Sequence, residues 1–246
     1  MVVRVLFVQQ DHVSPTGPVG EAFADRGYDV QHLRVVPEEH FHSPSVTVDF
    51  PDPLDFDVIV PLGAPWSVYD HDQIGSWVYD EIAFLRTAHE GGVPVLAICF
   101  GAQALAAALG GAVVPADRPE VGWTTVSTDR PDLVEPGPWF QWHGDRWRLP
   151  AGVAAFARTD VAEQAFVQGR SLGVQFHPEV TPAMLDGWLA NGGEQHARQL
   201  GVDPARLVRE TADGAAAAAE RARALVHGFL DTVATGRLQG SQGSAR

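Results

Sequence analysis

The chain has 246 residues, of which 45% are hydrophobic and 20% are charged, as is ordinary for a globular protein. Its formal net charge of −14 and its lack of any cluster of basic residues argue against a nucleic-acid partner. All 17 basic residues are arginines, which excludes chemistries that depend on lysine, such as a P-loop or a pyridoxal phosphate Schiff base.

The cysteine content and the hydropathy of the chain indicate the cellular compartment in which we expect the protein. Cys99 is the single cysteine, so the chain can form neither an intrachain disulfide nor a multi-cysteine zinc site. No run approaches the roughly 18 apolar residues of a membrane span. The short apolar run at residues 2–8 is followed by polar residues, which fits a buried strand better than a signal peptide. We therefore expect a cytoplasmic protein that does not enter a membrane.

The first 110 residues alternate between strand-like and helix-like patterns. The expected strands are residues 2–8, 29–36, 56–62 and 93–98, and the expected helices are residues 19–26, 77–90 and 102–109. Continuous apolar strands separated by helices indicate a parallel sheet that is covered on both faces.

After residue 111 the pattern changes to short strands separated by proline, glycine and aspartate. The candidates are residues 121–128, 153–157, 165–168 and 172–176, and they predict a small antiparallel excursion from the sheet. Helices are expected at residues 182–190, 204–213 and 215–235. We divide the chain into a main domain at 1–190, a helical C-terminal extension at 191–239 and a disordered tail at 240–246.

Residues 94–103 carry the strongest chemical signal. A buried strand delivers Cys99 to a sharp turn, Gly101 follows, and a helix begins at once, which is typical of a nucleophile elbow with cysteine in place of serine. The helix dipole favours the thiolate there, and the turn brings the N–H of Phe100 close to a reacting carbonyl. Most lone cysteines are buried small hydrophobes, but this position favours a nucleophile. The usual first glycine of the turn is Ala97, which fits if its backbone stays in a β conformation.

Among ten histidines, His177 has the best context for a general base. An apolar strand ends there, Pro178 turns the chain, and Glu179 follows two residues later. A thiolate nucleophile needs an acid–base partner whose tautomer is fixed by a third group. On its own this segment would be interpreted as an ordinary strand end, but beside the elbow it predicts the triad Cys99, His177 and Glu179.

These segments together resemble the class I glutamine amidotransferases. The resemblance rests on Cys99 in its elbow, on Gln103 four residues later, and on Gln-Phe-His-Pro-Glu at residues 175–179. Glu-Val-Gly-Trp at residues 120–123 and Trp-His-Gly-Asp at residues 142–145 further resemble stand-alone proteins similar to the amidotransferase domain of GMP synthase. The resemblance covers about residues 3–188. It implies a flavodoxin-like α/β fold: a mostly parallel sheet with helices on both faces, a small antiparallel excursion and a helical C-terminal extension.

The resemblance also implies a reaction. Cys99 would form a γ-glutamyl thioester, and His177 would protonate the departing ammonia and then activate water. One oxyanion donor is implied at the N–H of Phe100 and the other in the turn at residues 62–65, where Ala64 replaces the usual glycine. Further substrate contacts are implied at Gly63 in this turn, at Gln103, and at the loop formed by His143, Gly144 and Asp145.

Three functions fit these residues. The chain could be a glutaminase subunit that delivers ammonia to a separate synthase partner, or a stand-alone hydrolase or transferase acting on another γ-glutamyl compound. It could also be a silent binding or regulatory module, which the triad disfavours and which Ala64 and Ala97 keep open. No phosphate loop follows residue 188, so a complete GMP synthase is not expected and the ammonia acceptor is not revealed. Neither a cofactor nor a metal is expected, because the histidines at residues 40–42 and 70–72 have no third ligand in a recognisable spacing.

Overall fold

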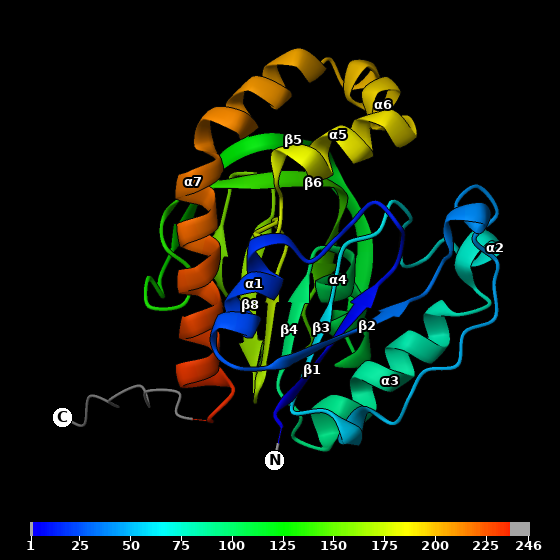
Figure 1. The fold of residues 1–246 in the computed structure, drawn as a ribbon, viewed down its shortest axis with the longest axis vertical. Helices are drawn as coiled ribbons and strands as arrows, with labels where there is room; N and C mark the ends of the chain where they lie inside the picture. Colours follow the sequence, from blue (N-terminus) through cyan, green and yellow to red (C-terminus); the bar gives the residue numbers. More distant parts are fainter. Residues whose placement is uncertain (1, 237–246) are drawn as a thin grey trace.

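The computed structural model describes residues 2–236, and one mixed sheet runs through them (Figure 1). The strand order is β2-β1-β3-β4-β9-β8-β7-β5-β6. The strands are β1 (Arg4–Gln9), β2 (Asp29–Arg34), β3 (Val58–Pro61), β4 (Val95–Ile98), β5 (Ala112–Thr128), β6 (Gly137–Arg148), β7 (Ala155–Arg158), β8 (Glu163–Gln168) and β9 (Ser171–Val174). The first four strands and β9 pair in parallel, and the other pairings are antiparallel.

Helices cover both faces of the parallel part. They are α1 (Gly17–Asp25), α2 (His71–Ile74), α3 (Val78–Glu90), α4 (Phe100–Ala108), α5 (Pro182–Trp188), α6 (Glu194–Gln199) and α7 (Pro204–Gly228), with short helical turns η1 (Glu38–His40), η2 (Pro53–Asp55), η3 (Leu189–Gly193) and η4 (Phe229–Val233). Alternate residues of the buried strands face opposite sides, so Phe7 packs with α1 and α7 while Leu6 packs with α3 and α4. The expected α/β fold is confirmed.

The antiparallel part differs from its prediction. β5 begins at residue 112 rather than 121, and β6 was not predicted at all. Pro115 and Pro119 are typical of turns, which obscured the start of β5. In the structure both prolines lie at a bulge between Pro115 and Glu120, where the hydrogen bonding between β5 and β6 is interrupted. Residues 142–145 therefore lie in a strand rather than in a loop.

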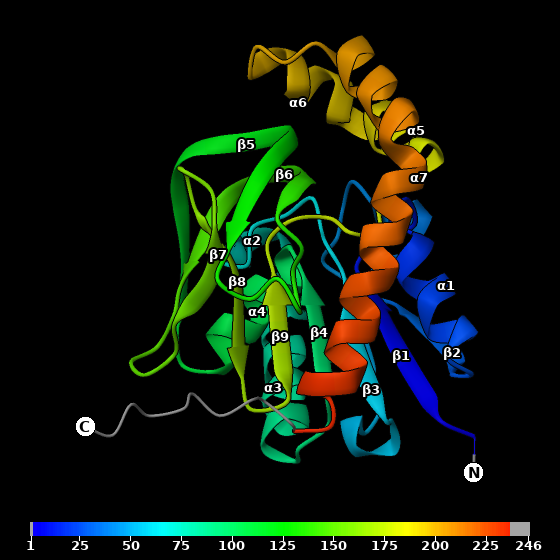
Figure 2. The same ribbon diagram turned by 90° about the vertical axis from the view of Figure 1, so that its left-hand side faces the viewer.

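The C-terminal helices pack on the rest of the molecule at two places. Figures 1 and 2 show α7 running beside α1. Ala222 and Leu225 of α7 and Phe229 of η4 join the core on this face of the sheet. A smaller core forms between α5, α6 and the strand residue Phe140. The break expected at residue 214 is wrong, because α7 continues through Gly214 as a single helix. The expected disordered tail at 240–246 and the end of the extension at 237–239 lie outside the described residues.

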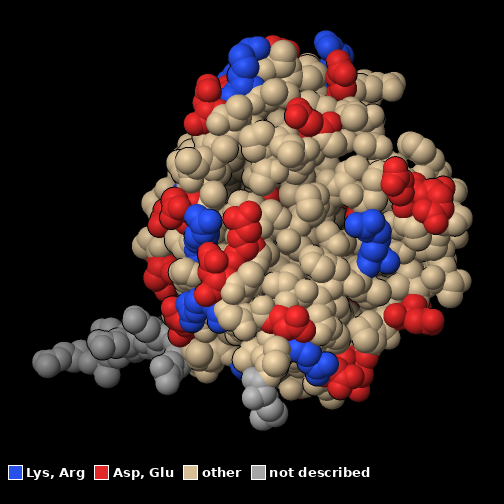
Figure 3. Space-filling view, in the orientation of Figure 1, with Lys and Arg blue, Asp and Glu red and all other residues tan. Residues whose placement is uncertain are grey.

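None of the helices in residues 2–236 combines the length and the hydropathy of a membrane span. On the face seen in Figure 3, arginines are interspersed with acidic side chains. The carboxyl ends of the parallel strands meet at one edge of the sheet, which is where doubly wound folds bind their ligands. Asp11, Gly63 and Cys99 follow β1, β3 and β4 at this edge, and His177 follows β9.

Candidate active site

Cys99 occupies a strained turn between β4 and α4. Its backbone has φ 50° and ψ −110°, and it is the one non-glycine residue in the described part of the chain with a positive φ. Such a conformation costs on the order of 1–3 kcal/mol and marks functional sites. The N–H of Gly101 donates to the carbonyl of Leu62 at 3.0 Å, and a Cβ on Gly101 would clash with the backbone of Pro61. Close packing of α4 against β3 thus requires the glycine and holds the elbow in place.

The two alanines that replace the usual glycines are accommodated without strain. Ala97 lies within β4 and pairs with Gly173, so its backbone is extended. Ala64 is not among the positive-φ residues, so its backbone lies outside the left-handed region that disfavours a side chain. The neighbouring Gly63 is needed, because a Cβ there would lie 2.8 Å from Cε1 of His177.

His177 and Glu179 form a buried pair beside Cys99. Nδ1 of His177 lies 2.7 Å from Oε1 of Glu179, and the two residues are 4% and 0% exposed. Burial alone would lower the pKa of His177, but interactions with Cys99 and Glu179 outweigh it and raise the pKa well above 6.5. Nε2 of His177 has no hydrogen-bond partner within residues 2–236. The imidazole therefore has one nitrogen fixed and the other free for a reacting group.

Two glutamines connect the nucleophile to its surroundings. Nε2 of Gln103 donates to the carbonyl of Asp145 at 3.3 Å and to Oε1 of Gln175 at 3.2 Å. Nε2 of Gln175 in turn donates to Sγ of Cys99 at 3.7 Å. Gln175 was not predicted as a site residue, although its place two residues before His177 at the end of an apolar strand was a usable signal.

His143 is held in place through both ring nitrogens. Nδ1 lies 2.9 Å from the carbonyl oxygen of Asp145, and Nε2 lies 3.1 Å from Oε2 of Glu120. These two contacts fix the orientation of the ring between β6 and the carboxylate of Glu120. Oε2 of Glu120 also accepts from Thr159 at 3.0 Å and from Gln164 at 3.1 Å. His143 lines the cavity, but its polar atoms are already used by this network.

Asp145 joins β6 to the loop that follows β3. Its carboxylate accepts hydrogen bonds from the hydroxyl of Ser67 at 2.5 Å and from that of Tyr69 at 2.6 Å. Because Gly63 and Ala64 belong to the same loop, this contact aligns the turn next to Cys99. Neither Ser67 nor Tyr69 was predicted from the sequence.

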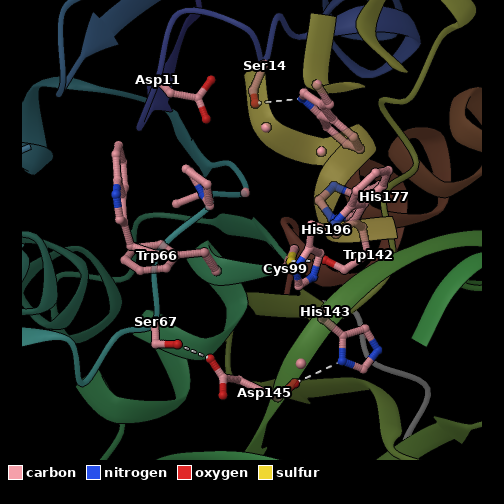
Figure 4. A pocket seen from close by; sticks show the side chains of 18 of the residues that line it. Asp11, Ser14, Trp66, Ser67, Cys99, Trp142, His143, Asp145, His177 and His196 are labelled. Atoms are coloured by element: carbon pink, nitrogen blue, oxygen red, sulfur yellow. Dashed lines mark hydrogen bonds between the residues drawn. The ribbon is translucent and has the colours of Figure 1, made fainter. Parts of the chain in front are cut away.

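These residues surround a cavity of about 650 Å³ with Cys99 at its base. All the predicted site residues except Glu179, which lies behind His177, line this cavity: Gly63, Ala64, Cys99, Phe100, Gln103, His143, Gly144, Asp145 and His177. Figure 4 shows Trp142, His177 and His196 to one side of Cys99, and Trp66 and Ser67 to the other. Asp11 also lines the cavity, and burial raises its pKa. Within the described residues, no three acidic, histidine or cysteine side chains are grouped to hold a metal ion.

Comparison with known proteins gives a consistent result. The model of the glutamine amidotransferase class-I family matches residues 21–192. GMP synthase [glutamine-hydrolyzing] of Thermomicrobium roseum is 41% identical over 136 residues, which cover 52% of this chain and 24% of that protein. The corresponding enzyme of Alcanivorax borkumensis is 39% identical over 132 residues, covering 47% of this chain and 24% of the enzyme. The chain thus spans about a quarter of the length of these curated relatives.

Solved structures show the same fold. A glutamine amidotransferase from Thermotoga maritima superposes with a TM-score of 0.79 at 22% identity, over 94% of this chain and 100% of that one. A glutamine amidotransferase from Methylobacillus flagellatus superposes with a TM-score of 0.77 at 22% identity, over 94% of this chain and 95% of that one. Since the family model spans well over half of the sequence, the protein belongs to the class I glutamine amidotransferase family.

Proposed function

We propose that the protein is a cysteine-dependent amidotransferase that hydrolyses the side-chain amide of glutamine through a γ-glutamyl thioester on Cys99. The observation that carries this proposal is the strained elbow of Cys99 beside the His177–Glu179 pair, at the base of a cavity large enough for glutamine. The family assignment independently supports a reaction on glutamine.

In the first half of the reaction, Sγ of Cys99 attacks the γ-carbonyl carbon of glutamine. The raised pKa of His177 keeps the imidazole protonated near neutral pH, which stabilises a neighbouring thiolate. As the C–N bond breaks, Nε2 of His177 gives its proton to the departing ammonia. The N–H groups of Phe100 and Ala64 stabilise the oxyanion, and donors of this kind contribute on the order of 3 kcal/mol each.

In the second half, water hydrolyses the thioester. Nε2 of His177 accepts a proton from the water as its oxygen attacks the carbonyl carbon, and the C–S bond breaks to release glutamate and the Cys99 thiolate. The 2.7 Å contact of Glu179 with Nδ1 holds the imidazole in the orientation that both halves need.

The α-amino and α-carboxylate groups of glutamine bind on the side of the cavity formed by Gly63, Gln103, Gly144 and Asp145. The Asp145 carboxylate suits the α-ammonium group, and its two hydroxyl donors fix its direction. His143 acts as a positioning residue, because it reaches the substrate side only through the carbonyl of Asp145.

The ammonia acceptor is proposed to be a synthase partner in the cytoplasm. The two curated relatives described above are GMP synthases, and this chain matches only about a quarter of each. A catalytically silent module is disfavoured, because Ala64 and Ala97, the two departures that favoured it, carry no strain.

The test is glutamate release from L-glutamine, measured with the wild type and with Cys99→Ala. Turnover that is lost in the variant is expected, and turnover that persists in Cys99→Ala would refute the thioester. Some amidotransferases need their partner for turnover, so a glutamine-like diazoketone provides a second readout. It should alkylate Cys99, as located by mass spectrometry, and a wild-type protein that neither turns over glutamine nor is labelled would refute the proposal.

A further inference from the structure

The cavity around Cys99 is larger than glutamine requires. Its volume of about 650 Å³ lies in the middle of the range of about 300–1,000 Å³ that is typical of sites for drug-sized ligands. Glutamine is far smaller than such ligands. Once the glutamyl part is seated against Gln103 and Asp145, a substantial part of the cavity is left over.

The position of His177 shows on which side a leaving group must lie. Nε2 of His177 is the atom proposed to protonate the departing nitrogen, so whatever that nitrogen carries sits next to the imidazole. The ring of Trp188 lies against the imidazole, with centroids 4.9 Å apart, and Trp142 packs edge-to-face on Trp188 at 5.9 Å. Figure 4 places Trp142 and His196 on the His177 side of Cys99 and Asp145 below it.

The aromatic wall on this side is fixed in position. The indole N–H of Trp188 donates to the hydroxyl of Ser14 at 3.1 Å, which sets the direction of that ring. His196 stacks on Trp142 with 21° between their planes and 6.4 Å between their centroids. The helical geometry breaks at Asn191 and Gly192, where Gly192 has a φ of 99°, and His196 of the following helix α6 lines the cavity.

Gly193, next to this break, allows the chain to approach Trp142 and the backbone of Trp188 closely. A Cβ on Gly193 would lie 3.2 Å from the ring of Trp142 and closer still to the backbone of Trp188. The C-terminal helices thus complete an aromatic wall of the cavity beside the general acid. Ammonia, the leaving group of glutamine, makes no use of such a wall.

We propose that the site takes γ-glutamyl amides of amines that carry a flat aromatic group, with that group in the cavity against the aromatic wall formed by Trp142, Trp188 and His196. This inference rests on the proposed thioester mechanism. Sγ of Cys99 attacks the γ-carbonyl carbon, the C–N bond breaks, and Nε2 of His177 protonates the nitrogen, so that the free amine departs. Water then hydrolyses the thioester, and the net products are glutamate and the aromatic amine.

The test compares two amides with the same glutamyl part and alkylamine leaving groups of similar basicity, γ-glutamyl phenethylamide and γ-glutamyl ethylamide. Calorimetric binding to Cys99→Ala separates affinity from chemistry. The phenethylamide should bind at least about tenfold more tightly, which corresponds to about 1.4 kcal/mol. Equal or weaker binding of the phenethylamide would overturn the proposal.

Variants and kinetics locate the effect. His196→Ala should reduce the phenethylamide-to-ethylamide affinity ratio several-fold. Tyr79→Ala is the matched control, because Tyr79 is an aromatic residue that is 54% exposed on α3 and does not line the cavity, and it should leave the ratio unchanged. An unchanged ratio in His196→Ala would overturn the placement of the aromatic group against this wall.

The wild type should hydrolyse the phenethylamide with a higher kcat/KM than the ethylamide, in a reaction that Cys99→Ala abolishes. Tight binding of the phenethylamide without hydrolysis would overturn its assignment as a substrate. Hydrolysis of glutamine and the ethylamide with no preference for the phenethylamide would overturn this inference while leaving the proposed function intact. Failure of all three amides and of the diazoketone label would overturn both.

Discussion

Replacing Glu81 with glutamine should stabilise the protein at neutral pH. Glu81 lies on α3 and is 0% exposed. Its Oε1 accepts from Nε2 of Gln10 at 2.6 Å, while its Oε2 and the Oε1 of Gln10 have no partner within residues 2–236. A buried carboxylate beside an unpaired acceptor is unfavourable, and a proton on Glu81 supplies the donor that these atoms lack.

The magnitude follows from the pKa of Glu81, which burial raises from 4.5 to about 8. Between these two values the folded protein holds a proton that the unfolded chain has released. The free energy of unfolding therefore falls as pH rises, by about 1.4 kcal/mol per pH unit. The stability is fully present below pH 4.5 and is lost as pH rises through about 8. At pH 7 the loss amounts to about 3 kcal/mol, and Glu81→Gln, which resembles the protonated acid, should recover most of it.

Urea unfolding followed by tryptophan fluorescence, between about pH 5.5 and about pH 8.5, measures this effect. The wild type should lose stability across the range relative to Glu81→Gln. Glu90→Gln is the matched control, since Glu90 is exposed on the same helix and its replacement should change stability by less than about 0.5 kcal/mol. The reasoning is refuted if Glu81→Gln is no more stable than the wild type at pH 7.5 or shows the same slope with pH.

Three further predictions concern the site. Glu179→Gln removes one of the interactions that raise the pKa of His177, so the alkaline limb of the kcat/KM profile for glutamine should move to lower pH; an unmoved limb would contradict this origin of the pKa. His143→Ala should raise KM for glutamine more than it lowers kcat, because His143 only positions Asp145, and steady-state kinetics showing a pure kcat effect would be inconsistent with that role. Gly101→Ala should lower the free energy of unfolding by about 1–3 kcal/mol, because its Cβ meets the backbone of Pro61, and an unchanged denaturation midpoint would argue against this close packing.

The parallel half of the fold and the triad were predictable because their signals are local. Each buried strand is one unbroken apolar run, and the elbow and the histidine–glutamate turn each lie within a few consecutive residues. β5 and β6 were obscured because prolines and glycines at bulges look like turns in a single sequence. The pairing of two long strands is what tolerates those residues, and no window of the sequence contains both strands.

The wall of the cavity could not be predicted for a related reason. Ser14 and Trp142 are far in sequence from Trp188 and His196, and they meet them only because α5 and α6 fold over the carboxyl edge of the sheet. Asp145 likewise finds its hydroxyl partners some 76 and 78 residues away. Side chains that converge through tertiary packing leave no periodicity or spacing in the sequence. The domain boundary at residue 190 stays a prediction.

The positions of the tryptophans allow binding at the site to be followed by their fluorescence. Three of the seven tryptophans, Trp66, Trp142 and Trp188, line the cavity, whereas Trp77, Trp139 and Trp147 are buried in the cores. A ligand bound in the cavity displaces water from around the three tryptophans that line it, and the buried tryptophans serve as an internal reference. The unlabelled protein can therefore report which compounds enter, and how fast, before any bond to sulfur is made.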